Sequence, residues 1–309
     1  MRLKVMFLPL LSLILVFILC VNTNAQLPEK PATVMIGVRL ANVEKIDLQS
    51  NSYKLDFYLW FIFDPAEISL NDVKAFEFLN GVPSKELIYE NETEGFLEYR
   101  VKGDFVKTFD FSHYPFESQN LVISIEHKNM NTTYLIYEVD PDSSIDSEIN
   151  IVGWDIKRFD LQIVEHRFSG TTFSNFVLNL EVQRPFFSSF IKSVLPVSVI
   201  TTISLLTFFI SPQNFSQRIS LGVTTLLSAS TFHLALIGGI PSTGYLTLAD
   251  RMMLSIYIIF LYNLSTSVLI MRLVDFKQIE KAQLLNKKAA EMLLILIIIL
   301  IVIQLIIIN

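Results

Sequence analysis

Four long apolar stretches in the carboxyl-terminal part limit what this chain can fold into. They cover approximately residues 186–210, 217–240, 251–274 and 288–308, each near or above the roughly 20 residues that a helix needs to cross a hydrocarbon core. Inside a bilayer the backbone polar groups have no water to bind, so helices are the expected conformation. The sequence therefore predicts a membrane domain of four helices over residues 185–309.

The preceding part of the chain has a different charge and a different periodicity. Residues 29–184 hold 14 Lys and Arg against 26 Asp and Glu, whereas residues 185–309 hold 8 against 4. In the segment FVLNLEVQ, residues 176–183, an apolar residue occupies every second position, which is typical of a half-buried strand. Several such short runs, separated by turn residues, predict an all-β, immunoglobulin-like sandwich over residues 26–184.

The first 25 residues have the layout of a cleavable signal peptide. Arg2 and Lys4 precede an apolar run, and small and polar residues follow it. An uncleaved anchor is the alternative, because a run of about 17 residues lies near the lower limit for spanning. The only cysteine, Cys20, lies in this segment, so we expect an exported chain without disulfides, which favours a prokaryotic envelope.

The distribution of basic residues predicts the orientation in the membrane. The linker after the third apolar stretch is basic, and the positive-inside tendency places it in the cytoplasm. We therefore expect a multi-pass protein of the plasma or inner membrane, with the β domain on the extracellular or periplasmic side. The basic residues of this region are Arg272, Lys277, Lys281, Lys287 and Lys288.

The second apolar stretch carries a polar stripe. Helical spacing aligns hydroxyls and leucines there, and the members are Ser220, Thr224, Leu227, Thr231 and Leu234. The hydroxyls can bond to carbonyls of their own helix or to a neighbouring helix, as is common in membrane bundles. Alternatively, symmetry-related copies line a pore, in which hydroxyl rings replace part of an ion's hydration and a leucine ring forms the gate. Such a pore requires a cyclic oligomer, because one chain supplies one stripe.

Several motifs together resemble one family. The segment YPFESQ, residues 114–119, resembles the FPFDxQ signature of the pentameric ligand-gated ion channels, the Cys-loop receptor superfamily. The junction Arg184-Pro185-Phe186-Phe187, followed by Pro196, is similar to the entry into that family's first helix. Two further segments, residues 153–156 and residues 238–251, resemble a tryptophan-containing strand and the loop between the second and third helices.

The resemblance extends in order from about Val34 to Ile308. It implies a homopentamer that binds ligand at extracellular subunit interfaces and conducts ions along its second helices. The family's loop disulfide would join the positions of Lys107 and Leu121, so it is missing here, as in bacterial members. The segment between the third and fourth apolar stretches is also short, which leaves no room for a large cytoplasmic domain and fits a compact, prokaryotic-type channel.

The resemblance assigns roles to residues of the pore and of the domain junction. It places Arg218 at the cytoplasmic mouth, followed outward by the polar stripe, with Leu227 as the gate. Arg184 requires a carboxylate partner, for which Glu117 is the first candidate and Asp47 the second; a static ion pair is the alternative reading. Tyr114, Pro115 and Phe116 are expected to lie against the loop at Pro241 to Tyr245. The full set expected at the junction is Asp47, Tyr114, Pro115, Phe116, Glu117, Arg184, Pro241 and Tyr245.

The ligand site is less well defined by the sequence. The family binds ligands among aromatic side chains, although strand aromatics more often belong to a core. The candidates are Tyr58, Phe76, Phe78, Tyr99, His127, Phe168 and Phe173. His127 and His166 can titrate near neutral pH, so the agonist is a small molecule or a proton. Calcium is a further possibility at Asp140, Asp142, Asp146 and Glu148, for which a solvated acidic turn is the alternative.

Residues 216–218, Ser-Gln-Arg, match neither the cation-selective nor the anion-selective pattern of the family, but the acidic outer domain favours cations.

Other function classes fit the sequence less well. A membrane-anchored β-sandwich with a binding or adhesion role, without conduction, is the main alternative, although a tether needs no polar stripe. The spans contain no catalytic constellation, and the sequence indicates no enzyme, no cofactor and no nucleic-acid partner.

Overall fold

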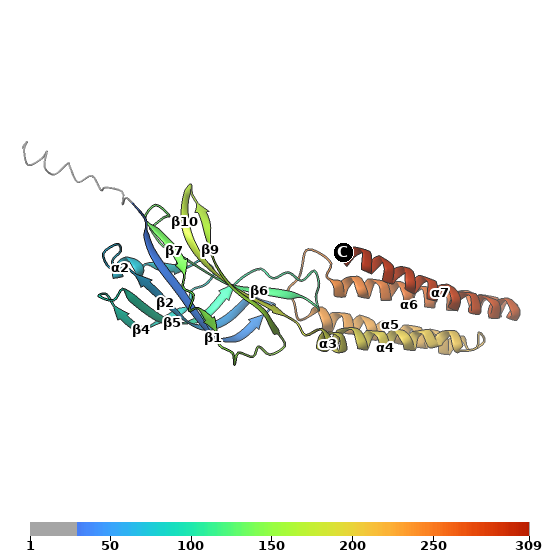
Figure 1. Ribbon diagram of the computed structural model, residues 1–309. Coiled ribbons are helices and arrows are strands. Elements are labelled where there is room, and N and C mark those ends of the chain that lie inside the picture. The colour runs from blue at the N-terminus through green and yellow to red at the C-terminus, as the bar shows by residue number, and fades with distance from the viewer. Residues whose placement is uncertain (1–29, 309) are drawn as a thin grey trace, which may run out of the picture.

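The computed structural model of the chain describes residues 30–308, and the predicted signal peptide lies outside them. A β domain and a bundle of helices lie end to end, and the helices run side by side away from the β domain (Figure 1). The predicted arrangement of a β-sandwich followed by apolar helices is therefore confirmed.

Ten strands form two sheets. In the first sheet the strand order is β4-β5-β2-β1-β7, with β8 paired to β1; in the second it is β3-β6-β10-β9. The strands are β1 Ala32–Asp47, β2 Ser52–Phe63, β3 Phe76–Phe78, β4 Ser84–Asn91, β5 Phe96–Val106, β6 Ser118–His127, β7 Leu135–Val139, β8 Ser144–Ile145, β9 Asp155–Phe168 and β10 Thr171–Gln183, and a short helix α2 spans Leu70–Val73.

The sheets enclose one core because each strand alternates its side chains between two faces. On β2, Phe57, Leu59 and Phe61 are fully buried, and on the opposing sheet Ile125 and Phe176 are fully buried too. The alternation read from residues 176–183 is present in β10, where Phe176, Leu178, Leu180 and Val182 are buried and the residues between them are only partly buried.

The helical part begins directly after β10. The first helical segment covers α3 (Phe186–Ser189), a π-helical turn (Phe190–Val194), α4 (Leu195–Leu205) and a 3₁₀ turn (Leu206–Phe209). Pro196 lacks a backbone N–H and follows the π-helical turn, so the hydrogen-bond pattern changes where the proline interrupts it. The remaining helices are α5 (Phe215–Ile237), α6 (Leu248–Asp275) and α7 (Ile279–Ile308).

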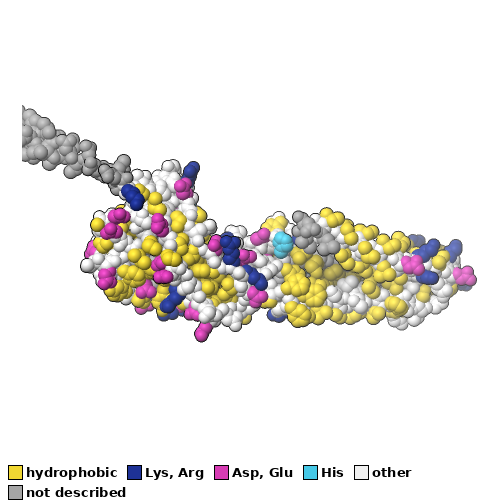
Figure 2. Space-filling view, viewed as in Figure 1, with side chains coloured by type: hydrophobic (Ala, Val, Ile, Leu, Met, Phe, Trp, Pro, Cys, Tyr) yellow, Lys and Arg dark blue, Asp and Glu magenta, His cyan; other side chains and the backbone are white. Residues whose placement is uncertain are grey.

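Three of these segments, Phe186–Phe209, α5 and α6, are long and apolar enough to cross a membrane. Helix α7 runs back along the bundle toward the β domain (Figure 1), and the crossing by α7 remains a prediction. Figure 2 shows hydrophobic side chains over the bundle, whereas charged side chains gather on the β domain and at the far end of the helices.

The basic linker expected between the third and fourth apolar stretches is mostly helical. Helix α7 begins at Ile279, so Lys281, Lys287 and Lys288 belong to the helix. Their neighbours include Ala, Gln and Leu, which are good helix formers, so the helix extends beyond the apolar stretch. A hydropathy pattern marks where a helix enters the bilayer and not where it begins.

Candidate functional site: the domain junction and the exposed face of α5

The loop between β5 and β6 is held at its base by Gln119. The Gln119 side chain donates from Nε2 to the carbonyl of Asp110 at 2.7 Å and accepts the Asp110 backbone N–H at 3.2 Å. Phe109 and Phe111 are buried in the sandwich core. The bulky residues of this loop are therefore anchored in the β domain, which leaves residues 112–117 to reach the helices.

The loop caps the start of α6. The amides of Leu248 and Ala249 donate to the carbonyls of Ser112 and Tyr114, both at 3.0 Å, and Arg251 Nη2 donates to the Ser112 carbonyl at 3.2 Å. The first amides of a helix have no partner within it, so these loop carbonyls satisfy them. Thr247 adds a capping box with the carboxylate of Asp250.

Tyr114 connects the same loop to the end of α5. Its hydroxyl donates to the carbonyl of Leu236 at 2.9 Å. Burial raises the pKa of Tyr114, so the phenol stays protonated and remains a donor. From the β1–β2 turn, Gln49 Nε2 donates to the carbonyl of Gly238 at 2.6 Å. Two extracellular side chains thus hold the carboxyl end of α5.

Arg184 pairs with Glu117 at the start of the first helical segment. Arg184 Nε lies 2.6 Å from Glu117 Oε1, and the Glu117 side chain is only 1% exposed. The guanidinium carbon also lies 4.7 Å from the Trp154 ring centroid. The structure therefore brings together Arg184 and its first candidate partner.

The second candidate partner of Arg184 is engaged elsewhere. Asp47 accepts from Lys45 Nζ at 2.6 Å, and this contact lowers the pKa of Asp47. Gln49, which reaches α5 from the same turn, was not predicted from the sequence because an uncharged amide gives no electrostatic signal.

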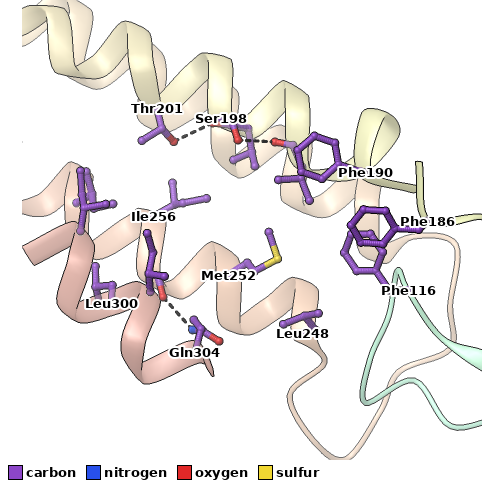
Figure 3. Close-up of a pocket in the computed structure, with 16 residues that line it drawn as sticks. Phe116, Phe186, Phe190, Ser198, Thr201, Leu248, Met252, Ile256, Leu300 and Gln304 are labelled. Atoms are coloured by element: carbon purple, nitrogen blue, oxygen red, sulfur yellow. Dashed lines mark hydrogen bonds between the residues drawn. The ribbon is translucent and has the colours of Figure 1, made fainter. Parts of the chain in front are cut away.

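Phe116 contacts the first helical segment and not the loop at Pro241 to Tyr245 where it was expected. Its ring stacks on Phe186 with centroids 5.2 Å apart, and Phe186 stacks on Phe190 at 6.2 Å. Tyr245 contacts the neighbouring part of the loop, since its hydroxyl accepts the amide of Phe111 at 2.9 Å. Phe116 and the two other phenylalanines border a cavity of about 540 Å³ between the helices (Figure 3).

The polar stripe of α5 is exposed in the subunit. All five of its residues are exposed, and Leu227 is 67% exposed. The opposite face packs on α6, where a Cβ at Gly222 would lie 2.6 Å from the Leu264 side chain. Thr231 donates to the carbonyl of Leu227 at 3.0 Å, so part of the hydroxyl stripe does bond within its own helix. The Thr231 hydroxyl oxygen can still accept a hydrogen bond from water or from a neighbouring group.

Arg218 lies away from this stripe, contrary to its expected place at the pore mouth. It is 0% exposed; Nη1 donates to the carbonyl of Ile210 at 3.0 Å, and Nη2 donates to Asn286 of α7 at 2.8 Å. Because successive helical residues are rotated by about 100°, Arg218 shares the buried face of Gly222 and Thr225. It anchors the cytoplasmic end of α5 to its neighbours.

Two of the proposed ligand residues belong to the core. Phe76 is fully buried and lies 4.8 Å from the Phe61 ring. His127 is also buried; Nδ1 accepts the amides of Asn129 and Met130, and Nε2 lies 2.9 Å from the carbonyl of Asp72. Burial lowers the pKa of His127. Neither side chain is available to a ligand from solution.

The other candidates are distributed over both sheets. Tyr58 lies between two guanidiniums, those of Arg39 at 4.6 Å and Arg100 at 5.6 Å. Phe78 and Tyr99 both pack against Phe76. Phe168 and Phe173 lie on the strands of the β9–β10 hairpin. The structure does not gather these aromatic residues into one box within a subunit.

One side-chain contact on the second sheet was not predicted from the sequence. Glu126 is buried, and its Oε2 lies 2.8 Å from His166 Nδ1, although β10 separates their two strands. Glu77 pairs in register with Glu126. Strand alternation in the sequence predicts which residues of one strand share a face. It does not predict which strands lie next to each other, so the contact between Glu126 and His166 could not be foreseen.

The proposed calcium residues form local turns. Asp140 accepts from Trp60 Nε1 at 2.6 Å and from the amide of Asp142 at 3.1 Å. Asp146 accepts the amide of Glu148 at 2.9 Å. Within residues 30–308, no group of three His, Cys, Asp or Glu side chains is placed to hold a metal ion. The acidic run is therefore better described as capped turns than as a calcium site.

These features define a multi-pass membrane protein whose outer β-sandwich holds the extracellular ends of its helices. Residues 193–297 match the family model described as the neurotransmitter-gated ion-channel transmembrane region. The chain is 24% identical over 266 residues to the proton-gated ion channel of Gloeobacter violaceus, covering 78% of this chain and 73% of that one. It is 26% identical over 145 residues to the gamma-aminobutyric acid receptor subunit rho-2 of Bos taurus, covering 46% of this chain and 31% of the subunit.

The chain is therefore similar to a neurotransmitter-gated ion-channel transmembrane region over residues 193–297, and to a proton-gated ion channel over most of its length. The match spans about a third of the length of the bovine receptor subunit and nearly three quarters of the bacterial channel. The bacterial relative is named an ion channel, and the bovine relative is named a receptor subunit. The lack of a loop disulfide agrees with a sequence that contains a single cysteine.

Proposed function

We propose that this chain forms a homopentameric ligand-gated channel that conducts cations through a pore lined by α5. The observation that carries the proposal is the exposed stripe of Ser220, Thr224, Leu227, Thr231 and Leu234. Hydroxyls turned toward lipid are unfavourable, so this face requires protein or water as its neighbour. Around a symmetry axis the stripe supplies hydroxyl rings, with a leucine ring at Leu227 as the gate.

Cation conduction is supported by the charges around this pore. Residues 29–184 contain 12 more acidic than basic residues, which concentrates cations near the outer mouth. At the inner mouth, the Arg218 guanidinium is bonded to Ile210 and Asn286 and not exposed beside Ser220. A ring of five exposed arginines at the inner mouth would oppose cation entry. Because Arg218 is buried within each subunit, no such ring forms in the proposed pentamer.

We propose the proton as the agonist and a small amine as the second candidate. The aromatic candidates Phe76 and His127 are core residues, which weakens the case for an aromatic amine site. The hydrogen bond between Glu126 Oε2 and His166 Nδ1 instead places a buried carboxyl group beside an imidazole, the side-chain type that most often serves as a pH switch. The relative from Gloeobacter violaceus is named a proton-gated channel.

Opening is proposed to pass from the β domain to α5 through residues 112–117 and Arg184. The loop contacts the first helical segment through Phe116 and Glu117, the end of α5 through Tyr114, and the start of α6 through backbone hydrogen bonds. A displacement of the loop therefore acts on several helices at once. Pro115 belongs to this β5–β6 loop, and Pro241 belongs to the loop between α5 and α6.

Current recording from the purified protein in planar bilayers tests the function. Acidification from about pH 7.5 to about pH 5 is expected to activate current, and amines and calcium are tested separately. Reversal potentials in a salt gradient decide between cations and anions. A monomer in native mass measurement would contradict the channel proposal, whereas current that responds to amines alone would contradict only the proposed agonist.

A further inference from the structure

Strand β6 lacks a neighbouring strand along part of one edge. On one side, β10 pairs with it in register from Ser118 to Glu126. On the other side, β3 pairs with it only at residues 125–127, and within residues 30–308 no strand covers the rest of that edge. Backbone groups at an uncovered strand edge need partners of another kind.

Two side chains provide these partners, Tyr53 of β2 and Asn80 of the loop after β3. The Tyr53 hydroxyl donates to the Val122 carbonyl at 2.6 Å and accepts the Val122 amide at 2.9 Å. Asn80 donates from Nδ2 to the same carbonyl at 2.7 Å and accepts the Ser124 amide on Oδ1 at 3.2 Å. We call Tyr53 and Asn80 together the β6 clamp.

The clamp depends on a buried, protonated phenol. Tyr53 is only 1% exposed, and its ring packs against Phe105 and Phe109. Burial raises the pKa of Tyr53 to about 12, so the hydroxyl keeps its proton at neutral and acidic pH. Asn80 Nδ2 lies 3.1 Å from the Tyr53 hydroxyl oxygen, so the two clamp residues also hold each other in place.

Asn80 also joins the two strands that border the loop over residues 107–117. Its backbone carbonyl accepts the Val106 amide at 2.8 Å, and its Nδ2 lies 3.3 Å from the Val106 carbonyl. Val106 is the last residue of β5, in the first sheet, whereas Val122 belongs to β6, in the second. One side chain therefore contacts the strand before the loop and the strand after it.

We propose that Tyr53 and Asn80 are positioning residues that make the two ends of this loop move together. The inference rests on the proposed function, because it concerns how a movement passes from the β domain to α5. Without the clamp, β5 and β6 belong to different sheets and shift independently at this point, so the loop absorbs the displacement. With the clamp, the loop carries the displacement to its contacts with α5 and α6.

The clamp lies beside the positions at which the resemblance places the family's loop disulfide. Lys107 directly follows Val106, and Leu121 directly precedes Val122. Neither position holds a cysteine in this chain. The hydrogen bonds of Tyr53 and Asn80 thus provide a non-covalent connection at the base of the loop.

Hydrogen–deuterium exchange of the full chain in a neutral detergent tests the clamp without current. Tyr53→Phe removes one oxygen and keeps the ring, and Asn80→Ala removes every side-chain contact of Asn80. The matched control is Asn91→Ala, which also loses two hydrogen bonds from a side-chain oxygen to backbone amides, but at the β4–β5 turn. Melting temperatures verify that each variant is folded, and Tyr53→Phe decides if Asn80→Ala does not fold.

We expect amide exchange to rise about tenfold in residues 118–127 and roughly threefold in residues 245–252 of both clamp variants, with no change in Asn91→Ala. The second range includes Leu248 and Ala249, whose amides donate to carbonyls of the loop, so it reports whether the loosening reaches the helices. An increase confined to β6 means that the clamp stabilises the sandwich alone, and that result overturns the proposal. Unchanged exchange in β6 overturns it as well.

Current recording relates the clamp to gating. The agonist concentration for half-maximal current is expected to rise about three- to tenfold in Tyr53→Phe and in Asn80→Ala, and to stay the same in Asn91→Ala. A normal activation curve in both clamp variants also overturns the proposal. Wild-type protein that gives no current contradicts the proposed function, whereas the exchange at residues 245–252 still decides on the clamp.

Discussion

Removing the Glu117 carboxylate is the sharpest test of how the two domains are connected. Its side chain is 1% exposed and lies 2.6 Å from Arg184, whose side chain is 27% exposed between Trp154 and Tyr114. Breaking a buried pair by deleting one partner costs about 3–5 kcal/mol, because the other charge stays buried and unpaired. Arg184 retains some solvent, so we expect about 2–3 kcal/mol for Glu117→Ala.

The isosteric variant Glu117→Gln separates charge from shape. Glutamine still accepts from Arg184 Nε, so it loses only the difference between a charge-assisted and a neutral hydrogen bond, about 1 kcal/mol. If the pair transmits the movement, this energy appears as a shift in the agonist concentration for half-maximal current, up to about fivefold for Gln and tenfold or more for Ala. The purified variants are compared by current recording and by native mass measurement.

The double variant Glu117→Gln with Arg184→Gln completes a mutant cycle. A direct interaction predicts a coupling energy of about 1–3 kcal/mol between the two positions. Lys45→Gln serves as a control, since it breaks the exposed pair with Asp47 and is expected to leave gating unchanged. A Glu117→Ala variant that has the native mass of the wild-type assembly and a normal activation curve would refute the proposed transmission through Arg184.

Three further predictions concern the gate, the loop and the buried histidine. Leu227→Thr places a hydroxyl at the proposed constriction, so the activation curve is expected to shift toward lower agonist concentration; an unchanged curve contradicts the proposed gate. Phe116→Ala removes the stack on Phe186, worth about 0.5–1.5 kcal/mol beyond its buried area, and is expected to reduce current at unchanged agonist binding. Because burial lowers the pKa of His127, the folded protein resists protonation there and loses stability as pH falls through the unfolded pKa of about 6.5. In melting experiments His127→Gln is therefore expected to destabilise the protein at about pH 8, with a smaller difference from wild type at about pH 5.

The domain layout was predictable because it depends on local patterns. The alternation in residues 176–183 and the apolar stretches record which side chains face a core or lipid, and that information lies within each segment. The same local reasoning would also have corrected one assignment. Arg218 shares a helical face with Gly222 and Thr225, the residues that pack inward, and the resemblance to a family obscured this.

The contacts that build the junction and the second sheet were not predictable in the same way. Gln49 meets Gly238 from 189 positions away, and Glu126 meets His166 across an intervening strand. Such pairs depend on which strands and turns become neighbours, which a single sequence does not record. Phe116 illustrates the limit: its apolar character predicted burial at the membrane border but did not distinguish Phe186 from the loop at Pro241 to Tyr245.

The contacts along α5 indicate which part of it is able to move. At the cytoplasmic end, Arg218 is bonded to the Ile210 carbonyl and to Asn286, and both partners belong to the helical domain itself. At the extracellular end, Tyr114 and Gln49 bond to carbonyls of the last turn, and both belong to the β domain. A displacement of the β domain therefore acts on the upper end while the lower end stays fixed. The expected motion is a tilt of α5 about its cytoplasmic end, which moves Leu234 more than Leu227 and Leu227 more than Ser220.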